Sequence, residues 1–98
     1  MRFDFEWDIK KARNNIRKHK VSFERAATVF RDPNMRSVAD DKHSDNEERW
    51  ITMGIDESGN LLVTVHTFSA VGRNISRIRI ISARKATRRE RKQYEEGI

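Results

Sequence analysis

Hydrophobic and polar residues follow two different periods along the first part of this chain. Phe3, Phe5 and Trp7 alternate with polar residues, which is the period of a short half-buried strand. Behind Asp8, an N-cap residue, apolar residues then recur at helical spacing over residues 9–19, with Lys and Arg at the outward positions. The pattern predicts a strand followed by a cationic amphipathic helix.

A second helix is predicted directly after the first. Ser22 offers another N-cap, and the apolar residues that follow it share one helical stripe at positions i, i+3, i+4 and i+7: Phe23, Ala26, Ala27 and Phe30. The Asp-Pro-Asn sequence at residues 32–34 ends this helix. Because only Lys20 and Val21 separate the two helices, we expect a helical hairpin that packs on a sheet.

The middle of the chain predicts several strands. Residues 35–41 form a weak candidate, whereas residues 49–56 and 61–68 alternate clearly around a turn at 57–60 and predict a β-hairpin. Residues 75–83 contain adjacent isoleucines, which suggests a central strand that is buried on both faces.

A third helix is predicted at the C-terminus. Thr87 and Glu90 form the T-x-x-E pattern of a capping box, and the helix should run to Tyr94 and end near Gly97. Its polar surface suggests that it is either mobile or docked on a partner. The order of elements predicts one α+β domain over residues 1–98, with an antiparallel sheet, an N-terminal helical hairpin on one face and a C-terminal helix.

Charge is unevenly distributed along the chain. The 21 Lys and Arg residues exceed the 15 Asp and Glu residues, and the net charge is +6. Residues 1–36 carry +5, residues 37–60 carry −5 and residues 73–98 carry +6. Two cationic segments around an acidic one predict a polyanionic partner, foremost nucleic acid. The alternative is that these are solvated basic helices that bind nothing.

Composition also excludes several classes of protein. The chain has no cysteine, which excludes disulfides, thiolate nucleophiles and sulfur-ligated metals and fits a reducing cytoplasm. No apolar stretch approaches the length of a membrane span, and no signal peptide is recognisable at the N-terminus. We therefore expect a cytoplasmic protein that does not contact a membrane.

The alternation of residues sorts the predicted sheet into two faces. One face collects aliphatic residues and is expected to lie beneath the helices: Ile51, Met53, Ile55, Leu61, Val63, Val65, Ile78 and Ile80. The other face is expected to be open and collects polar residues: Thr52, Thr64, His66, Arg77 and Arg79. Two arginines on an open face suit phosphate oxygens. Alternatively, these arginines pair with acidic residues on neighbouring strands.

Two histidines are the first candidates for acid–base chemistry. His43 and His66 titrate near neutral pH, and Glu47 or Glu48 could orient one of them. The alternative for a lone histidine is a structural role, which we also expect for His19. The three histidines are far apart in sequence and no glycine-rich phosphate loop is present, so we expect neither a metal nor a cofactor.

Several short motifs are spread over nearly the whole chain: Phe5-Glu6-Trp7-Asp8, Asn15, Lys18-His19 before Val21-Ser22-Phe23 and Ala26, Phe30, Asp32, His43-Ser44 before Glu48-Arg49, Arg79-Ile80-Ile81-Ser82-Ala83-Arg84, Ala86, Glu90-Arg91 and Tyr94. Together they resemble the BrnT toxins of bacterial type II toxin–antitoxin systems. The RIISAR segment with its downstream E-R-x-x-Y is the most specific part. One departure is Lys20, where members of that family commonly carry glycine.

The resemblance implies a RelE-like fold and a ribonuclease that inhibits translation. It also implies neutralisation by a BrnA-like antitoxin, in a hetero-oligomeric complex that binds operator DNA through the antitoxin and represses its own operon. These properties are expectations from the family alone.

The polar face of the predicted sheet and the loop before it contain the candidate residues for metal-independent RNA cleavage. Proton transfer is assigned to His43 or His66 with Glu47 in support, and phosphate binding to Arg77 and Arg79. Contacts to the rest of the RNA, or to an acidic antitoxin surface, are assigned to further cations: Arg49, Arg84, Arg88, Arg89 and Lys92. The competing hypotheses are a module that binds nucleic acid or an antitoxin without catalysis, and a purely structural protein.

Overall fold

The computed structural model describes residues 2–43 and 47–97, apart from the side chain of His43. The elements in these residues are β1 (Arg2–Trp7), α1 (Ile9–His19), α2 (Phe23–Thr28), the short 3-10 helix η1 (Val29–Arg31), β2 (Arg36–Ala39), a second 3-10 helix η2 (Asp41–His43), β3 (Arg49–Ile55), β4 (Leu61–Gly72), β5 (Ile75–Lys85) and α3 (Arg88–Glu95). Every predicted helix and strand is present, and β4 continues past its predicted end.

The predicted helix starts are confirmed by their caps. The Asp8 carboxylate accepts a hydrogen bond from the backbone N–H of Lys11, at 2.9 Å, and the Ser22 hydroxyl accepts one from Arg25, at 3.1 Å. Thr87 and Glu90 make both bonds of the capping box. Lys20 ends α1 with φ 59°, a left-handed conformation that glycine adopts at little cost. Lys20, the departure from the family pattern, therefore adopts a backbone conformation that is unfavourable for a residue with a side chain.

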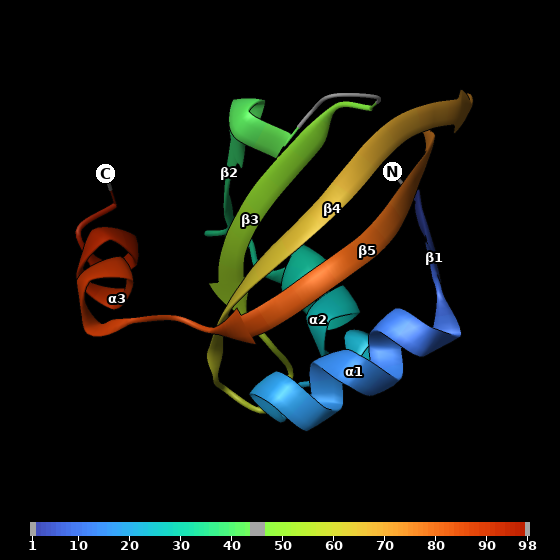
Figure 1. Cartoon of the computed structure of the whole chain (residues 1–98). Coiled ribbons are helices and arrows are strands. Elements are labelled where there is room, and N and C mark those ends of the chain that lie inside the picture. Colours follow the sequence, from blue (N-terminus) through green and yellow to red (C-terminus); the bar gives the residue numbers. More distant parts are fainter. Residues whose placement is uncertain (1, 44–46, 98) are drawn as a thin grey trace.

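The sheet has the strand order β1-β5-β4-β3-β2 and is mixed (Figure 1). Strands β2 to β5 pair in antiparallel fashion, as predicted, but β1 pairs in parallel with β5 and places Phe5 opposite Ile78. The expectation of a purely antiparallel sheet was wrong for this strand. Its partner is the strand most distant in sequence, and local hydrophobic periodicity carries no information about such a pairing.

The helical hairpin covers one face of the sheet (Figure 1). The core lies between them and consists of helical and strand residues: Val21, Phe23, Ala26, Val29, Phe30, Leu62, Ile78, Ile80 and Ala83, with Phe3, Phe5 and Trp7 packed against them. We call this side of the sheet the covered face and the other side the open face. Helix α3 lies beyond the β2 and β3 side of the sheet (Figure 1). None of the described helices has both the length and the apolar character that crossing a membrane requires.

A buried asparagine joins α1 to the sheet. Asn15 accepts a hydrogen bond from the backbone N–H of Ala83, at 3.0 Å, and donates to the Ala83 carbonyl, at 2.8 Å. It also donates to the carbonyl of Val21, at 2.9 Å. Since β1 ends at Trp7, opposite Ile80, the Asn15 amide takes the place of a strand residue beside β5.

Candidate functional site

The two faces of the hairpin are reversed relative to the prediction. His66 lies opposite Ile80 in the ladder, and its ring meets the ring of Phe30 edge-on with centroids 4.9 Å apart. Thr52 and Thr64 share this side and are fully buried. His66 therefore lies on the covered face, and the expectation that it shares an open floor with Arg77 and Arg79 was wrong.

Hydrogen bonding explains how polar residues occupy the covered face. The Thr52 hydroxyl lies 2.6 Å from Nε2 of His66 and 2.7 Å from the hydroxyl of Ser37, so these groups bind one another. The Thr64 hydroxyl has no such partner in the described part of the chain. On the open face, Ile51, Met53 and Val65 remain only half-buried.

Strand β5 presents its arginines on the open face. In the ladder with β4, Arg77 lies opposite Ser69 and Arg79 opposite Thr67. The register then shifts at Ile81, which has no partner in the ladder. This irregularity returns Arg84 to the same face as Arg79, although five positions separate the two residues. The predicted placement of Arg77 and Arg79 on the open face is confirmed.

A carboxylate lies between two of the open-face arginines. Glu47 forms an ion pair with Arg79 through one oxygen, and its other oxygen lies 4.0 Å from Nε of Arg49. The three side chains are 30–39% exposed, so water and a ligand can reach them. We call Glu47, Arg49 and Arg79 the Arg79 cluster. The ion pair of Arg79 is thus made with the loop before β3, and the parallel register with the neighbouring β1 also places Asp4 opposite Arg77 and Glu6 opposite Arg79 on this face.

A second ion pair links the open face to α3. Arg84 donates two hydrogen bonds to Glu90, at 2.8 and 2.9 Å. Hydrogen bonding to Arg84 lowers the pKa of Glu90 to about 2, and the same bonds raise the pKa of Arg84. Tyr94 donates to the Asp32 carboxylate at 2.5 Å and so also attaches α3 to the domain.

The structure distributes the remaining candidates unevenly. Arg88, Arg89 and Lys92 are exposed on α3 and lie apart from the Arg79 cluster. The side chain of His43 is outside the described residues, so its approach to Arg79 stays a prediction. Among the described side chains, no group of three or more potential metal ligands is gathered in one place.

Two cations on the open face, Arg2 and Arg36, were not among the predicted site residues. Arg36 of β2 lies opposite Met53 and therefore shares the face of the Arg79 cluster. Arg36 and Val38 lie on one face of β2, and Ser37 lies on the other. This alternation could have indicated the position of Arg36, but the strand was predicted only weakly. Arg36 enlarges the positive surface beyond the residues first proposed.

The fold and the arginine-lined face define a small α+β protein whose exposed sheet surface suits an anion such as a phosphate group. A sequence model of the family described as "Ribonuclease toxin, BrnT, of type II toxin-antitoxin system" matches residues 7–90. The chain belongs to this family, as the resemblance of its motifs predicted.

Comparison with solved structures supports the same fold. The chain is similar to the 1.1 Å crystal structure of the Brucella abortus ribonuclease toxin BrnT, with a TM-score of 0.60 and 20% sequence identity. The alignment covers 90% of this chain and 100% of the other. A search of curated proteins found no match. At this identity the structural likeness concerns the fold alone.

Proposed function

We propose that the chain is an endoribonuclease toxin that cleaves RNA without a metal ion at the open face of its sheet. The family supports the reaction class. The observation that carries the location is the Arg79 cluster, in which two guanidinium groups and one carboxylate lie together at a partly exposed surface. The guanidinium groups supply the positive charge that a metal ion would otherwise supply to a phosphate.

Cleavage requires one attack and two proton transfers. The ribose 2′-oxygen attacks the adjacent phosphorus, the bond from phosphorus to the 5′-oxygen breaks, and a 2′,3′-cyclic phosphate and a 5′-hydroxyl result. In the proposal, Arg79 and Arg49 bind the non-bridging phosphate oxygens. When the phosphate takes over these arginines, the Glu47 carboxylate is released to accept the 2′-hydroxyl proton, and His43 protonates the leaving oxygen.

His66 is not part of this proposal. His66 is 3% exposed and lies on the covered face, where the sheet separates it from Arg79. Burial lowers the pKa of His66, so the ring is neutral near pH 7. The remaining assignments are kept: Arg77 and Arg84 flank the cluster on β5, and Arg88, Arg89 and Lys92 extend the cationic surface along α3 toward the RNA backbone.

The proposal extends to partners and location. A type II system pairs a toxin with a protein antitoxin, and we propose a BrnA-like antitoxin that covers the open face in a hetero-oligomer. This complex represses its own operon, with operator DNA bound through the antitoxin. The free toxin acts in the cytoplasm and inhibits translation by cleaving RNA.

Incubation of the purified chain with RNA in EDTA tests the enzyme directly. Arg79→Ala should slow cleavage about 100- to 1000-fold, the usual cost of losing one group that stabilises a developing charge. Glu47→Gln should slow it about 100- to 10,000-fold, the usual cost of losing a general base. Arg13→Ala is the matched control, since Arg13 is exposed on α1 on the other side of the sheet. Its rate should be unchanged.

Two results would contradict the proposal. Full cleavage by folded Arg79→Ala and His43→Ala proteins would remove the open face from catalysis. Salt-sensitive retardation of RNA in a gel without any cleavage would instead support the non-catalytic nucleic-acid-binding module.

A further inference from the structure

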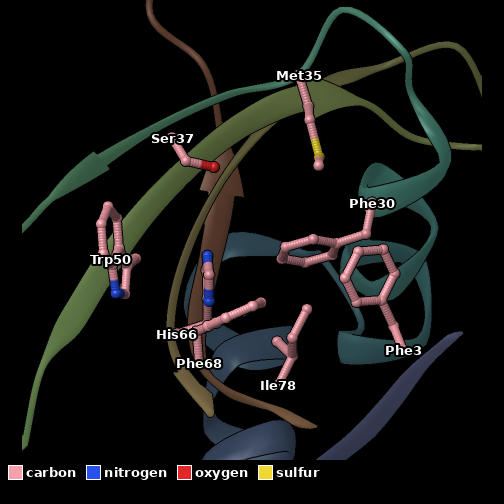
Figure 2. A pocket seen from close by; sticks show the side chains of 8 residues that line it. All are labelled: Phe3, Phe30, Met35, Ser37, Trp50, His66, Phe68 and Ile78. Carbon is pink, nitrogen blue, oxygen red and sulfur yellow. The ribbon is translucent and has the colours of Figure 1, made fainter. Parts of the chain in front are cut away.

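A pocket of about 210 Å³ lies on the covered face, away from the Arg79 cluster (Figure 2). Its lining is mostly aromatic and aliphatic: Phe3, Phe30, Met35, Trp50, Phe68 and Ile78, together with Ser37 and His66. Ile78 and His66 are buried, whereas Phe68 is 45% exposed. The pocket therefore leads from the molecular surface to the core.

The size and lining of the pocket suit a small ring. An apolar cavity of about 150 Å³ is enough to bind benzene, because such cavities hold water poorly. Aromatic walls also favour an aromatic guest through edge-to-face and offset contacts. Figure 2 shows the phenyl rings of Phe3 and Phe30 on one side of the pocket and the indole ring of Trp50 on the other.

The polar side of the pocket has a fixed direction of hydrogen bonding. Nδ1 of His66 lies 3.0 Å from the carbonyl of Thr67, which can only accept, so Nδ1 carries the proton of the neutral ring. Nε2 must then accept from the Thr52 hydroxyl at 2.6 Å. Thr52 in turn accepts from the Ser37 hydroxyl at 2.7 Å, and the only hydroxyl proton of Ser37 is thereby used.

The pocket consequently offers an acceptor and no free donor from this chain of groups. Both imidazole nitrogens of His66 are occupied, and the Ser37 oxygen keeps a lone pair at the pocket wall. We propose that the pocket binds a small, flat aromatic molecule that carries one N–H or O–H donor, of the indole or phenol type, with its ring among the aromatic walls and its donor on the Ser37 hydroxyl. This site is independent of the proposed ribonuclease site, because it lies on the other face of the sheet.

Isothermal titration calorimetry at about pH 7.5, where histidine is neutral, tests the proposal with indole, 1-methylindole and phenol. Indole should bind with a dissociation constant of about 0.1–1 mM, which is modest for a ligand of this size. 1-Methylindole lacks the donor and should bind about 3- to 10-fold more weakly.

Two substitutions at one position separate recognition from occupancy. Ser37→Ala should abolish the preference for indole over 1-methylindole, while Ser58→Ala, in an exposed turn, should preserve it. Ser37→Phe should place a ring in the pocket and abolish binding of all three compounds. Ser37 is exposed on an edge strand, so both variants are expected to fold, as circular dichroism would verify.

The proposal is overturned if the unmodified chain binds none of the compounds at about 2 mM, well above the expected dissociation constant. It is equally overturned if Ser37→Ala leaves the ratio of the two indole affinities unchanged. RNA cleavage by Ser37→Ala should equal that of the unmodified chain, so failure here does not bear on the ribonuclease proposal.

Discussion

The two faces of the sheet use polar residues in opposite ways. On the covered face, Ser37, Thr52 and His66 bind one another and sit within an otherwise apolar layer. On the open face, Arg79 and Arg49 share one carboxylate at the surface, where the aliphatic residues Ile51, Met53 and Val65 are only half-buried. Hydrophobicity alone therefore does not decide which face of the sheet is covered. Polar groups tolerate burial when their hydrogen bonds are made within the layer.

Neighbouring residues of β5 should show the strongest contrast between the faces. Ile80 is 1% exposed in the core, and Ile80→Ala should lower the free energy of unfolding by about 2–5 kcal/mol through lost burial and a cavity. Arg79→Ala, one position earlier, should lower it by less than about 1 kcal/mol. Denaturant titration followed by circular dichroism measures both. Equal losses would mean that the open face is as tightly packed as the covered one.

Asn15 tests how firmly the helical layer is attached to the sheet. Asn15→Ala removes three hydrogen bonds and leaves backbone groups of Ala83 and Val21 without partners. We expect a loss of about 2–3 kcal/mol in the free energy of unfolding. Asn14→Ala, on the exposed side of α1, is the matched control and should change little. If Asn15→Ala lowered the free energy of unfolding no more than Asn14→Ala does, water would be replacing the hydrogen bonds of the amide.

Gly54 probes the packing density beneath the helices. A Cβ added there would lie 2.8 Å from Cγ1 of Val29, too close without a shift of that buried side chain. Gly54→Ala should therefore cost about 1–3 kcal/mol, as overpacking usually does. Met53→Ala changes the preceding residue, which lies on the open face. It should lower the free energy of unfolding by less, because Met53 is only half-buried. Thermal unfolding of the two variants measures this order. If the covered face were loosely packed, Met53→Ala would cause the larger loss of stability.

The two faces should also lose stability in different pH ranges. Burial lowers the pKa of His66 below 6.5, so the unfolded chain binds this proton first as the pH falls. The free energy of unfolding should decrease below about pH 6.5, by at most about 1.4 kcal/mol per pH unit, until the folded-state pKa is passed. His66→Gln should remove this slope in a pH series of denaturant titrations, whereas His19→Gln should keep it.

The carboxylate of Glu90, which pairs with Arg84 of the open face, affects the stability of the fold at lower pH. The Arg84 partner lowers the pKa of Glu90 from 4.5 to about 2, so its contribution is complete above pH 4.5 and is lost as the pH falls toward 2. Glu90→Gln should flatten the curve in that range only. If His66→Gln and Glu90→Gln changed the same range, the two groups would not titrate independently.

Local patterns were sufficient for the elements of the fold. The caps at Asp8, Ser22 and Thr87 and the alternation around residues 57–60 depend on neighbours within a few positions, and each was predicted from them. The parallel pairing of β1 with β5 depends on residues far apart in sequence. No short-range pattern encodes it.

The site was only partly predictable for a related reason. Parity correctly placed Arg77 and Arg79 together, but it could not show the register shift at Ile81 that adds Arg84 to them. Parity also grouped Thr52 with His66 correctly, yet assigned the pair to the wrong side because their mutual hydrogen bonding is a tertiary property. The Glu47 bridge depends on the path of a loop, which alternation does not describe.

The amide of Asn15 has a consequence for solubility. Strand β5 extends beyond the end of β1. Without Asn15, the last residues of β5 would present unpaired backbone N–H and C=O groups to any extended chain nearby. By occupying both groups of Ala83, a single helical side chain blocks edge-to-edge addition of another molecule at that point. This border of the sheet is thereby protected from fibre-like growth through strand pairing.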